Sequence, residues 1–232
     1  MKRFYETVGV AKAGKRGWQV TLDGRGLKTV KGAPQIVPTR QLADALALEW
    51  SEQSEDIDTR RFVHRDQTDF AIDMVAIDPQ SSIDQMIKYA ETDTLCYRAD
   101  PEEALFERQL AKWEPLLCQV EERFGLKFTR VSGVIHRDQP EQTLDSLREL
   151  LATKDHFTLA GMQTMAALAA SLCVPLLALE DDAEPFSLWR AASLEEEWQA
   201  DLWGRDPQAE ERREKRQNAF LSAFEWVQLL SD

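Results

Sequence analysis

The stretch WQVTLDG, residues 18–24, carries the clearest structural signal near the start of this 232-residue chain. Its side chains alternate between apolar and polar, and Asp-Gly then follows, the pair typical of a tight hairpin turn. Short β-prone segments flank it at 4–10, 27–30 and 36–37, and Gly14–Gly17 predicts a turn before it. The first forty residues therefore predict a small antiparallel sheet.

The pattern becomes helical after Pro38. Thr39 is a suitable N-cap for a helix to about Gln53 with Leu42, Leu46 and Trp50 on one face. Residues 60–66 look irregular, and a strand is expected at 126–131. A helix is expected from Pro101 to Phe124, and Pro115 should kink or divide it. Another should begin at Ser81 or Ser82, and a last one at Pro207. The remaining helices are expected at 70–79, 144–151, 159–172 and 185–203.

These elements predict an α+β fold. We expect a small N-terminal antiparallel β-rich domain with one helix at residues 1–60. A larger, mainly α-helical domain is expected to follow at residues 61–232. The polar stretch between Arg60 and Arg65 is the expected protease-sensitive boundary.

Charge is unevenly distributed along the chain. The net charge is −13 and 43% of the residues are hydrophobic, which is typical of a soluble globular protein and argues against binding to nucleic acid or anionic membranes. Residues 1–32 hold eight basic and two acidic side chains, whereas the rest of the chain holds 20 basic and 39 acidic side chains. Self-docking of the basic head on the acidic body is the most economical interpretation.

Cysteine and histidine spacing indicates neither disulfides nor a metal site. The three cysteines and three histidines are scattered, which fits a reducing compartment. The apolar run 157–179 contains polar residues and Pro175, so we expect a buried helix and no membrane insertion. No signal or transit segment precedes Arg3, which favours a bacterial cytoplasmic protein over a mitochondrial matrix protein.

One motif resembles a nucleotide-binding loop and is rejected. Residues 9–15 have the form G-x-x-x-x-G-K, but Arg16 follows where magnesium binding needs Ser or Thr. A strand is then expected where the motif requires a helix N-terminus. No nucleotide site is predicted here.

The stretch AASLEEEWQADLWGRD, residues 191–206, is the most unusual part of the chain. On one continuous helix, Leu188, Ala191, Leu194, Trp198 and Leu202 would form an apolar stripe. Glu195 would lie inside that stripe, Glu196 at its border and Glu197 on the opposite face. Because an unpaired carboxylate is costly there, Glu195 should have a basic or hydrogen-bonding partner.

Other catalytic patterns are weak. No glycine-flanked nucleophilic serine is present, and His64 with Asp66 and Asp69 is a poor metal set. Glu195 with Asp93 could form an acid–base pair, but no further partner is recognisable. These observations favour a binding protein.

The order of several short motifs is similar to that of one known family. These motifs are Arg3-Phe4-Tyr5, Leu22-Asp23-Gly24-Arg25, Leu27-Lys28-Thr29, Val37-Pro38, Ala47-Leu48-Glu49-Trp50, Thr92-Asp93-Thr94-Leu95-Cys96-Tyr97-Arg98, Trp113-Glu114-Pro115-Leu116-Leu117, Leu194-Glu195-Glu196-Glu197-Trp198-Gln199 and Trp203-Gly204. Together they span nearly the whole chain. The chain resembles the assembly chaperones for the α subunit of the F-type ATP synthase catalytic head. Two departures are the polar segment 60–66 and Val30, where the family usually has proline.

The resemblance implies a non-enzymatic, cofactor-free chaperone that binds the unassembled α subunit and prevents its aggregation. The family's acidic helix falls on the 191–206 stretch, which makes Glu195, Glu196, Trp198, Gln199 and Trp203 the expected partner-binding residues. We expect a monomer. A hydrolase that uses Glu195 and a structural oligomer-forming subunit stay open as alternatives, and so does an internal ion pair for Glu195.

Overall fold

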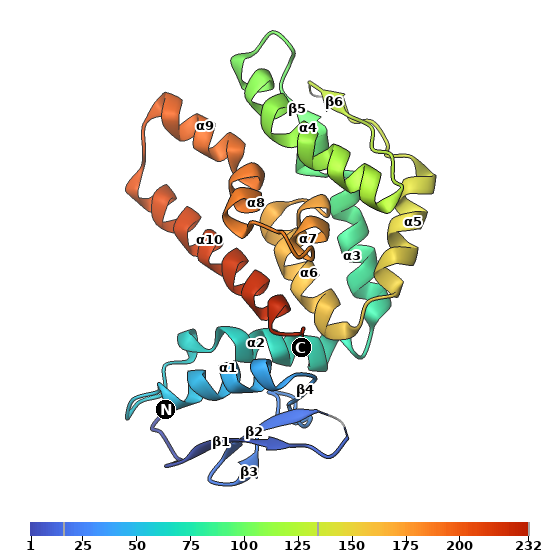
Figure 1. Ribbon diagram of the computed structural model, residues 1–232. Helices are drawn as coiled ribbons and strands as arrows, with labels where there is room; N and C mark the ends of the chain where they lie inside the picture. Colours follow the sequence, from blue (N-terminus) through green and yellow to red (C-terminus); the bar gives the residue numbers. More distant parts are fainter. Residues whose placement is uncertain (16, 134, 232) are drawn as a thin grey trace. The chain divides into compact units, whose positions relative to one another are not determined.

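The computed structural model describes residues 1–15, 17–133 and 135–231. The chain forms two compact units. Unit 1 comprises residues 1–79, 155–161 and the segment from Glu225 onward, and unit 2 comprises residues 80–154 and 162–224. The expected α+β class is confirmed: a small antiparallel sheet precedes a series of helices (Figure 1). A domain boundary near residue 60 stays a prediction.

Strand β2 (Trp18–Leu22) organises the sheet of unit 1. It pairs antiparallel with β1 (Val8–Lys12), β3 (Arg25–Gly26) and β4 (Ile36–Val37). At the β2–β3 turn Asp23 and Gly24 have φ of 47° and 77°, the left-handed conformation that a two-residue hairpin of this kind needs. The predicted hairpin is confirmed. The expected strand at 27–30 is wrong, because only Lys28 forms a bridge there, with Pro34.

Helix α1 (Arg40–Ser51) packs on this sheet as its pattern predicted (Figure 1). The Thr39 hydroxyl accepts a hydrogen bond from the Leu42 amide and caps the first turn. Leu42, Leu46 and Trp50 are buried. The Trp50 ring contacts Tyr5 and Phe62 in one aromatic cluster.

The segment 60–66 is ordered, so the expectation of an irregular loop is wrong. A 3₁₀ turn (Thr59–Arg61) leads into α2 (Val63–Phe70), and a π-helical turn (Ala71–Val75) follows. The Glu49 carboxylate accepts the backbone N–H groups of His64 (2.6 Å) and Arg65 (2.9 Å) and so caps α2. Because this cap comes from another helix, no local sequence signal reveals it.

The later elements begin with helix α3, which runs from Pro79 to Glu91. The others are a 3₁₀ turn (Thr94–Cys96), β5 (Tyr97–Arg98), α4 (Ala104–Phe124), β6 (Val131–Ser132), α5 (Glu141–Ala152), α6 (His156–Ala169), α7 (Cys173–Ala178), α8 (Pro185–Ala192), α9 (Leu194–Trp203) and α10 (Pro207–Gln228). Strands β5 and β6 pair in parallel. Pro115 lies inside α4 without dividing it, so a division there is wrong, and a kink at Pro115 stays a prediction. The strand expected at 126–131 is also wrong, because only Val131 of that range lies in a strand, β6.

The helix expected at 185–203 is two helices, α8 and α9, separated at Ser193. The Ser193 hydroxyl donates to the Trp189 carbonyl at 2.9 Å, a local bond that bends helices. The proposed apolar stripe is only partly buried. Leu188, Ala191 and Leu194 lie in the core, whereas 59% of Leu202 is exposed.

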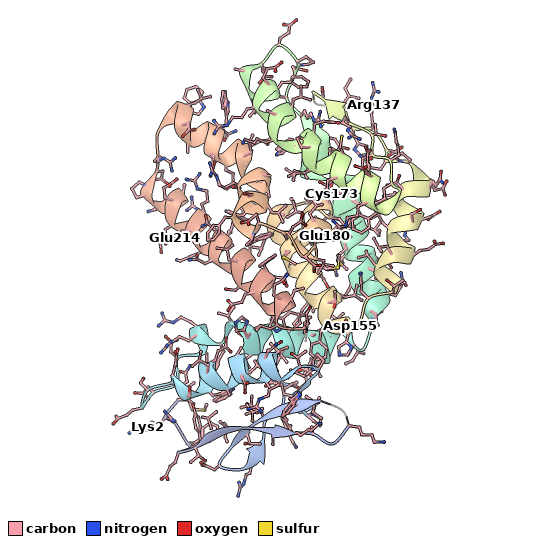
Figure 2. All side chains as sticks on the ribbon, viewed as in Figure 1. Lys2, Arg137, Asp155, Cys173, Glu180 and Glu214 are labelled. Carbon is pink, nitrogen blue, oxygen red and sulfur yellow. The ribbon has the colours of Figure 1, made fainter. Side chains whose placement is uncertain are left out.

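A fully buried carboxylate fixes the interior of unit 2. Asp93 accepts the backbone N–H groups of Leu95, Leu172 and Cys173 at 2.8–3.0 Å, and thereby ties the turn after α3 to the start of α7. Cys173 lies in this interior (Figure 2). Within the described residues Cys96, Cys118 and Cys173 are free thiols. Among the described helices, none has the length and apolar character to cross a membrane.

Candidate functional site

Helices α9 and α10 line a hollow of about 460 Å³ in unit 2. Three of the five predicted partner-binding residues, Glu196, Gln199 and Trp203, lie along it. Arginines of α10, among them Arg213 and Arg216, line the same hollow. We take the residues that line this α9–α10 hollow as the candidate site.

Exposed apolar side chains mark the end of α9. Trp203 is 86% exposed, and its neighbour Leu202 is also largely exposed. Gly204, with φ of 92°, ends the helix immediately afterwards. Large exposed aromatic side chains beside polar groups are typical of protein-binding surfaces, where tryptophan often supplies much of the binding energy.

Ion pairs position the polar side chains of the hollow. The Glu196 carboxylate lies 2.5 Å from Arg216, which also donates to the Leu168 carbonyl at 3.0 Å. Arg213 pairs with Glu210 at 2.6 Å, and this bond is the main reason that the pKa of Glu210 is lowered. Exposed pairs of this kind add little stability, so their contribution is to orient the polar groups around Trp203.

Glu195 lies outside this hollow. Its carboxylate accepts a hydrogen bond from the Gln109 side chain at 2.6 Å, and Gln109 is fully buried. Partial burial raises the pKa of Glu195, and the bond from Gln109 opposes that shift. The prediction of a hydrogen-bonding partner is confirmed, whereas the ion-pair alternative is wrong because the partner is a neutral amide.

The remaining acidic-helix residues also face α4. Trp198 is partly buried, and the Arg108 guanidinium lies 5.4 Å from the centre of its ring. Glu197 lines a second pocket with α4 and α8 residues. The five predicted residues are therefore divided between two sides of α9. The α10 arginines were not among the residues predicted from the sequence, although four basic side chains lie close together at 212–216.

No group of three His, Cys, Asp or Glu side chains suited to a metal ion occurs within residues 1–15, 17–133 and 135–231. His64, Asp66 and Asp69 belong to α2 and form no such group. Residues 9–12 lie in β1, and the next element is the strand β2, which begins at Trp18. Arg16, which argued against that loop, lies outside the described residues.

The chain is similar to known chaperones along most of its length. The family model for the ATP12 chaperone protein matches residues 2–121. The mitochondrial protein atp12 of Schizosaccharomyces pombe is 25% identical over 202 residues, which cover 80% of this chain and 68% of the relative.

Solved structures extend this likeness to the whole fold. Atp12 from Paracoccus denitrificans, solved also as a single-substitution mutant, is 31% identical, with a TM-score of 0.94 over 99% of this chain and 98% of the relative. The Atu1473 protein of Agrobacterium tumefaciens is 34% identical, with a TM-score of 0.94 over 99% and 86%. From the matched half of the sequence and the nearly complete structural overlap, we conclude that the chain belongs to the ATP12 chaperone family.

Proposed function

We propose that this protein assists assembly of the F-type ATP synthase by binding the unassembled α subunit and preventing its aggregation. The proposal extends the chaperone family membership to one client, as the sequence resemblance implied. The observation that supports a binding role is the α9–α10 hollow, with Trp203 exposed beside a set of oriented charges.

The chemistry of the client explains why such a surface would be useful. A subunit made for a ring exposes apolar interface and strand edges until its neighbours arrive, and these surfaces favour aggregation. Trp203 would cover apolar surface of the client, while Glu196, Gln199 and the α10 arginines would pair with polar groups at its edge. Binding of this kind needs neither a cofactor nor a catalytic group.

Aggregation of isolated α subunit, measured by light scattering with and without this protein, tests the proposal. We expect suppression of scattering and co-elution of the two proteins from a sizing column. Trp203→Ala should weaken binding by about tenfold or more, as for other tryptophan anchors. Phe186→Ala is the matched control, because Phe186 is an exposed aromatic residue of α8 outside the hollow.

Two results would contradict this proposal. If the α subunit aggregates as fast with this protein as without it, and the two do not co-elute, then the α subunit is not the client. Equal loss of binding in Trp203→Ala and Phe186→Ala would remove the α9–α10 hollow as the binding surface. Glu195→Gln should leave client binding through this hollow unchanged, since its carboxylate contacts Gln109 instead.

The alternative hydrolase hypothesis needs a second acid beside Glu195. Asp93, the candidate from the sequence, uses both carboxylate oxygens to accept backbone N–H groups deep in unit 2. The partner of Glu195 is Gln109. The hypothesis therefore gains no support from the positions of these residues.

A further inference from the structure

A smaller pocket lies on a different side of α9 from the α9–α10 hollow. It measures about 210 Å³, and α4, α8 and α9 line it. Three cationic side chains, Arg108, Lys112 and Arg190, contribute to its wall, with Glu197 as the one carboxylate among the described lining residues. In a chain of net charge −13 this local excess of positive charge is unusual. We refer to these lining residues as the basic pocket.

Buried side chains form most of the apolar part of the basic pocket. Ala191 and Leu194 are buried, and Leu116 is partly exposed beside them. The fully buried Trp113 donates its indole N–H to the Ala191 carbonyl at 2.8 Å, which fixes α4 against α8. A ligand would therefore bind to a pre-formed apolar surface with cations around it, and ordering of the pocket would cost little binding free energy.

The cations of the basic pocket are poorly neutralised. Lys112 and Arg190 are exposed and form no ion pair with any of the described residues. Arg108 lies 3.4 Å from Asp201, a long contact between exposed groups, and its guanidinium covers Trp198. Because like charges that line one pocket repel one another, a bound anion would be favoured there.

We propose that the basic pocket binds an acidic segment of a partner protein, with a Glu or Asp carboxylate beside Lys112 and Arg190 and a neighbouring apolar side chain against Leu116 and Leu194. This site is additional to the α9–α10 hollow and does not depend on which protein is the client there.

The size and lining of the pocket favour a peptide over other anions. Pockets for small molecules and cofactors usually measure about 300–1,000 Å³, so this one suits one or two side chains. Free phosphate would use the cations but would leave the apolar surface uncovered. An acidic peptide that also carries apolar residues matches both parts of the lining.

Fluorescence anisotropy with a labelled peptide Ser-Glu-Leu-Glu-Leu-Ser tests the proposal on the full-length protein. We expect saturable binding that weakens as salt is added, since exposed charges are screened. The analogue with Gln in place of both Glu residues should bind about tenfold more weakly or not measurably. Inorganic phosphate at matched ionic strength should not displace the peptide.

Charge-reversal variants locate the binding. Lys112→Glu/Arg190→Glu should weaken binding of the acidic peptide by about tenfold or more. Lys88→Glu/Lys127→Glu, which changes the net charge equally at exposed positions of unit 2 outside the pocket, should bind as the wild type does. Thermal melts of both variants should match the wild type, because all four side chains lie at the surface. A third variant, Leu116→Asp, should also weaken binding, as it removes apolar lining and adds a negative charge.

The proposal is overturned by equal losses in the two charge-reversal variants, by equal affinity for the Gln analogue, or by displacement with inorganic phosphate. The first result would indicate non-specific attraction, the second an apolar site, and the third a phosphate site. None of these results bears on α-subunit binding at the α9–α10 hollow, which Trp203→Ala tests separately.

Discussion

At the scale of single residues, the carboxylate of Glu195 illustrates how the identity of a partner changes an expected mutant. An ion pair would make Glu195→Gln destabilising by about 1–3 kcal/mol, because a buried charge would lose its counterion. The partner is the Gln109 amide N–H, which a glutamine carbonyl at position 195 can also accept. We therefore expect Glu195→Gln to change the free energy of unfolding little, and Glu195→Ala to cost about 1–3 kcal/mol by leaving the buried amide unpaired. Urea denaturation of both variants measures the difference.

The pH dependence of Glu195 follows from the direction of its pKa shift. Its pKa is raised in the folded state above the usual 4.5, so the native protein binds more protons than the unfolded chain between the two pKa values. Stability from this group therefore falls as pH rises through that interval and stays level above it. Relative to Glu195→Gln, the wild type should lose stability as pH rises from 4.5, measured by urea melts at successive pH values. A difference between the two proteins that does not vary with pH would contradict this prediction.

Asp93 should be far more sensitive to substitution. Its carboxylate accepts three buried backbone N–H groups, and an asparagine amide offers only one oxygen. Asp93→Asn should therefore destabilise the protein by about 1–3 kcal/mol, the cost of leaving buried donors unsatisfied. The exposed Asp182 provides the control, since Asp182→Asn should stay within about 0.5 kcal/mol. Equal stabilities for these two variants, in thermal or urea melts, would show that Asp93 does not tie the two segments together.

At the scale of elements, helix α6 meets the last turn of α10 within unit 1 at Gly161. A Cβ on residue 161 would lie 2.2 Å from Cγ2 of Val227 and 3.3 Å from the Trp226 ring. Alanine is normally the better helix former by about 1 kcal/mol. Here we expect the overlap to prevail, so that Gly161→Ala destabilises by about 1–3 kcal/mol in a urea melt.

The double variant Gly161→Ala/Val227→Ala tests whether steric overlap between the two side chains causes the expected loss of stability. Val227→Ala removes the overlapping methyl group and should recover part of the stability lost in Gly161→Ala, giving a favourable coupling between the two changes. Strictly additive losses would mean that the helices do not meet at this point.

At the scale of the whole molecule, limited proteolysis tests the domain boundary that we expect near residue 60. The Arg60 side chain is 88% exposed in a single 3₁₀ turn. We therefore expect trypsin to cut first between Arg60 and Arg65. A first cut within α6 would contradict this boundary.

The nicked protein gives a second observation. Thr29 and Lys31 donate to Asp73, and Val30 and Gln35 to Asp69, which fastens the 29–35 loop to the segment after the cut. These bonds lie within unit 1, so the fragments should co-elute on a sizing column after cleavage. Separation of the fragments would mean that these hydrogen bonds do not hold the two segments together.

Folding should require neither metal nor nucleotide. The described residues hold no cluster suited to a metal, and residues 9–12 form part of β1. Thermal melts should therefore be unchanged by a chelator or by magnesium with ATP. A large upward shift with magnesium and ATP would indicate nucleotide binding by the folded state.

Most of the secondary structure could be predicted because its causes are local. The Asp23-Gly24 turn needs residues that tolerate positive φ, and the alternation of β2 and the 3.6-residue period of α1 follow from backbone geometry. The 60–66 segment failed as a prediction because the cap of α2 comes from Glu49, about fifteen residues away. Likewise the 185–203 segment failed because a serine bond to the preceding turn breaks the helix.

The sequence by itself determined the α+β class, the hairpin, the first helix, the acidic 191–206 stretch and the family resemblance. These features depend on the order of residues along the chain and on the backbone conformations that neighbouring residues allow. Only the tertiary structure decided that Glu195 meets Gln109, that Glu196 meets Arg216, and that Trp203 stays exposed at the α9–α10 hollow. These outcomes depend on which distant side chains are brought within bonding distance. A hydrogen bond or a shielded surface depends on that distance, which neither periodicity nor composition specifies.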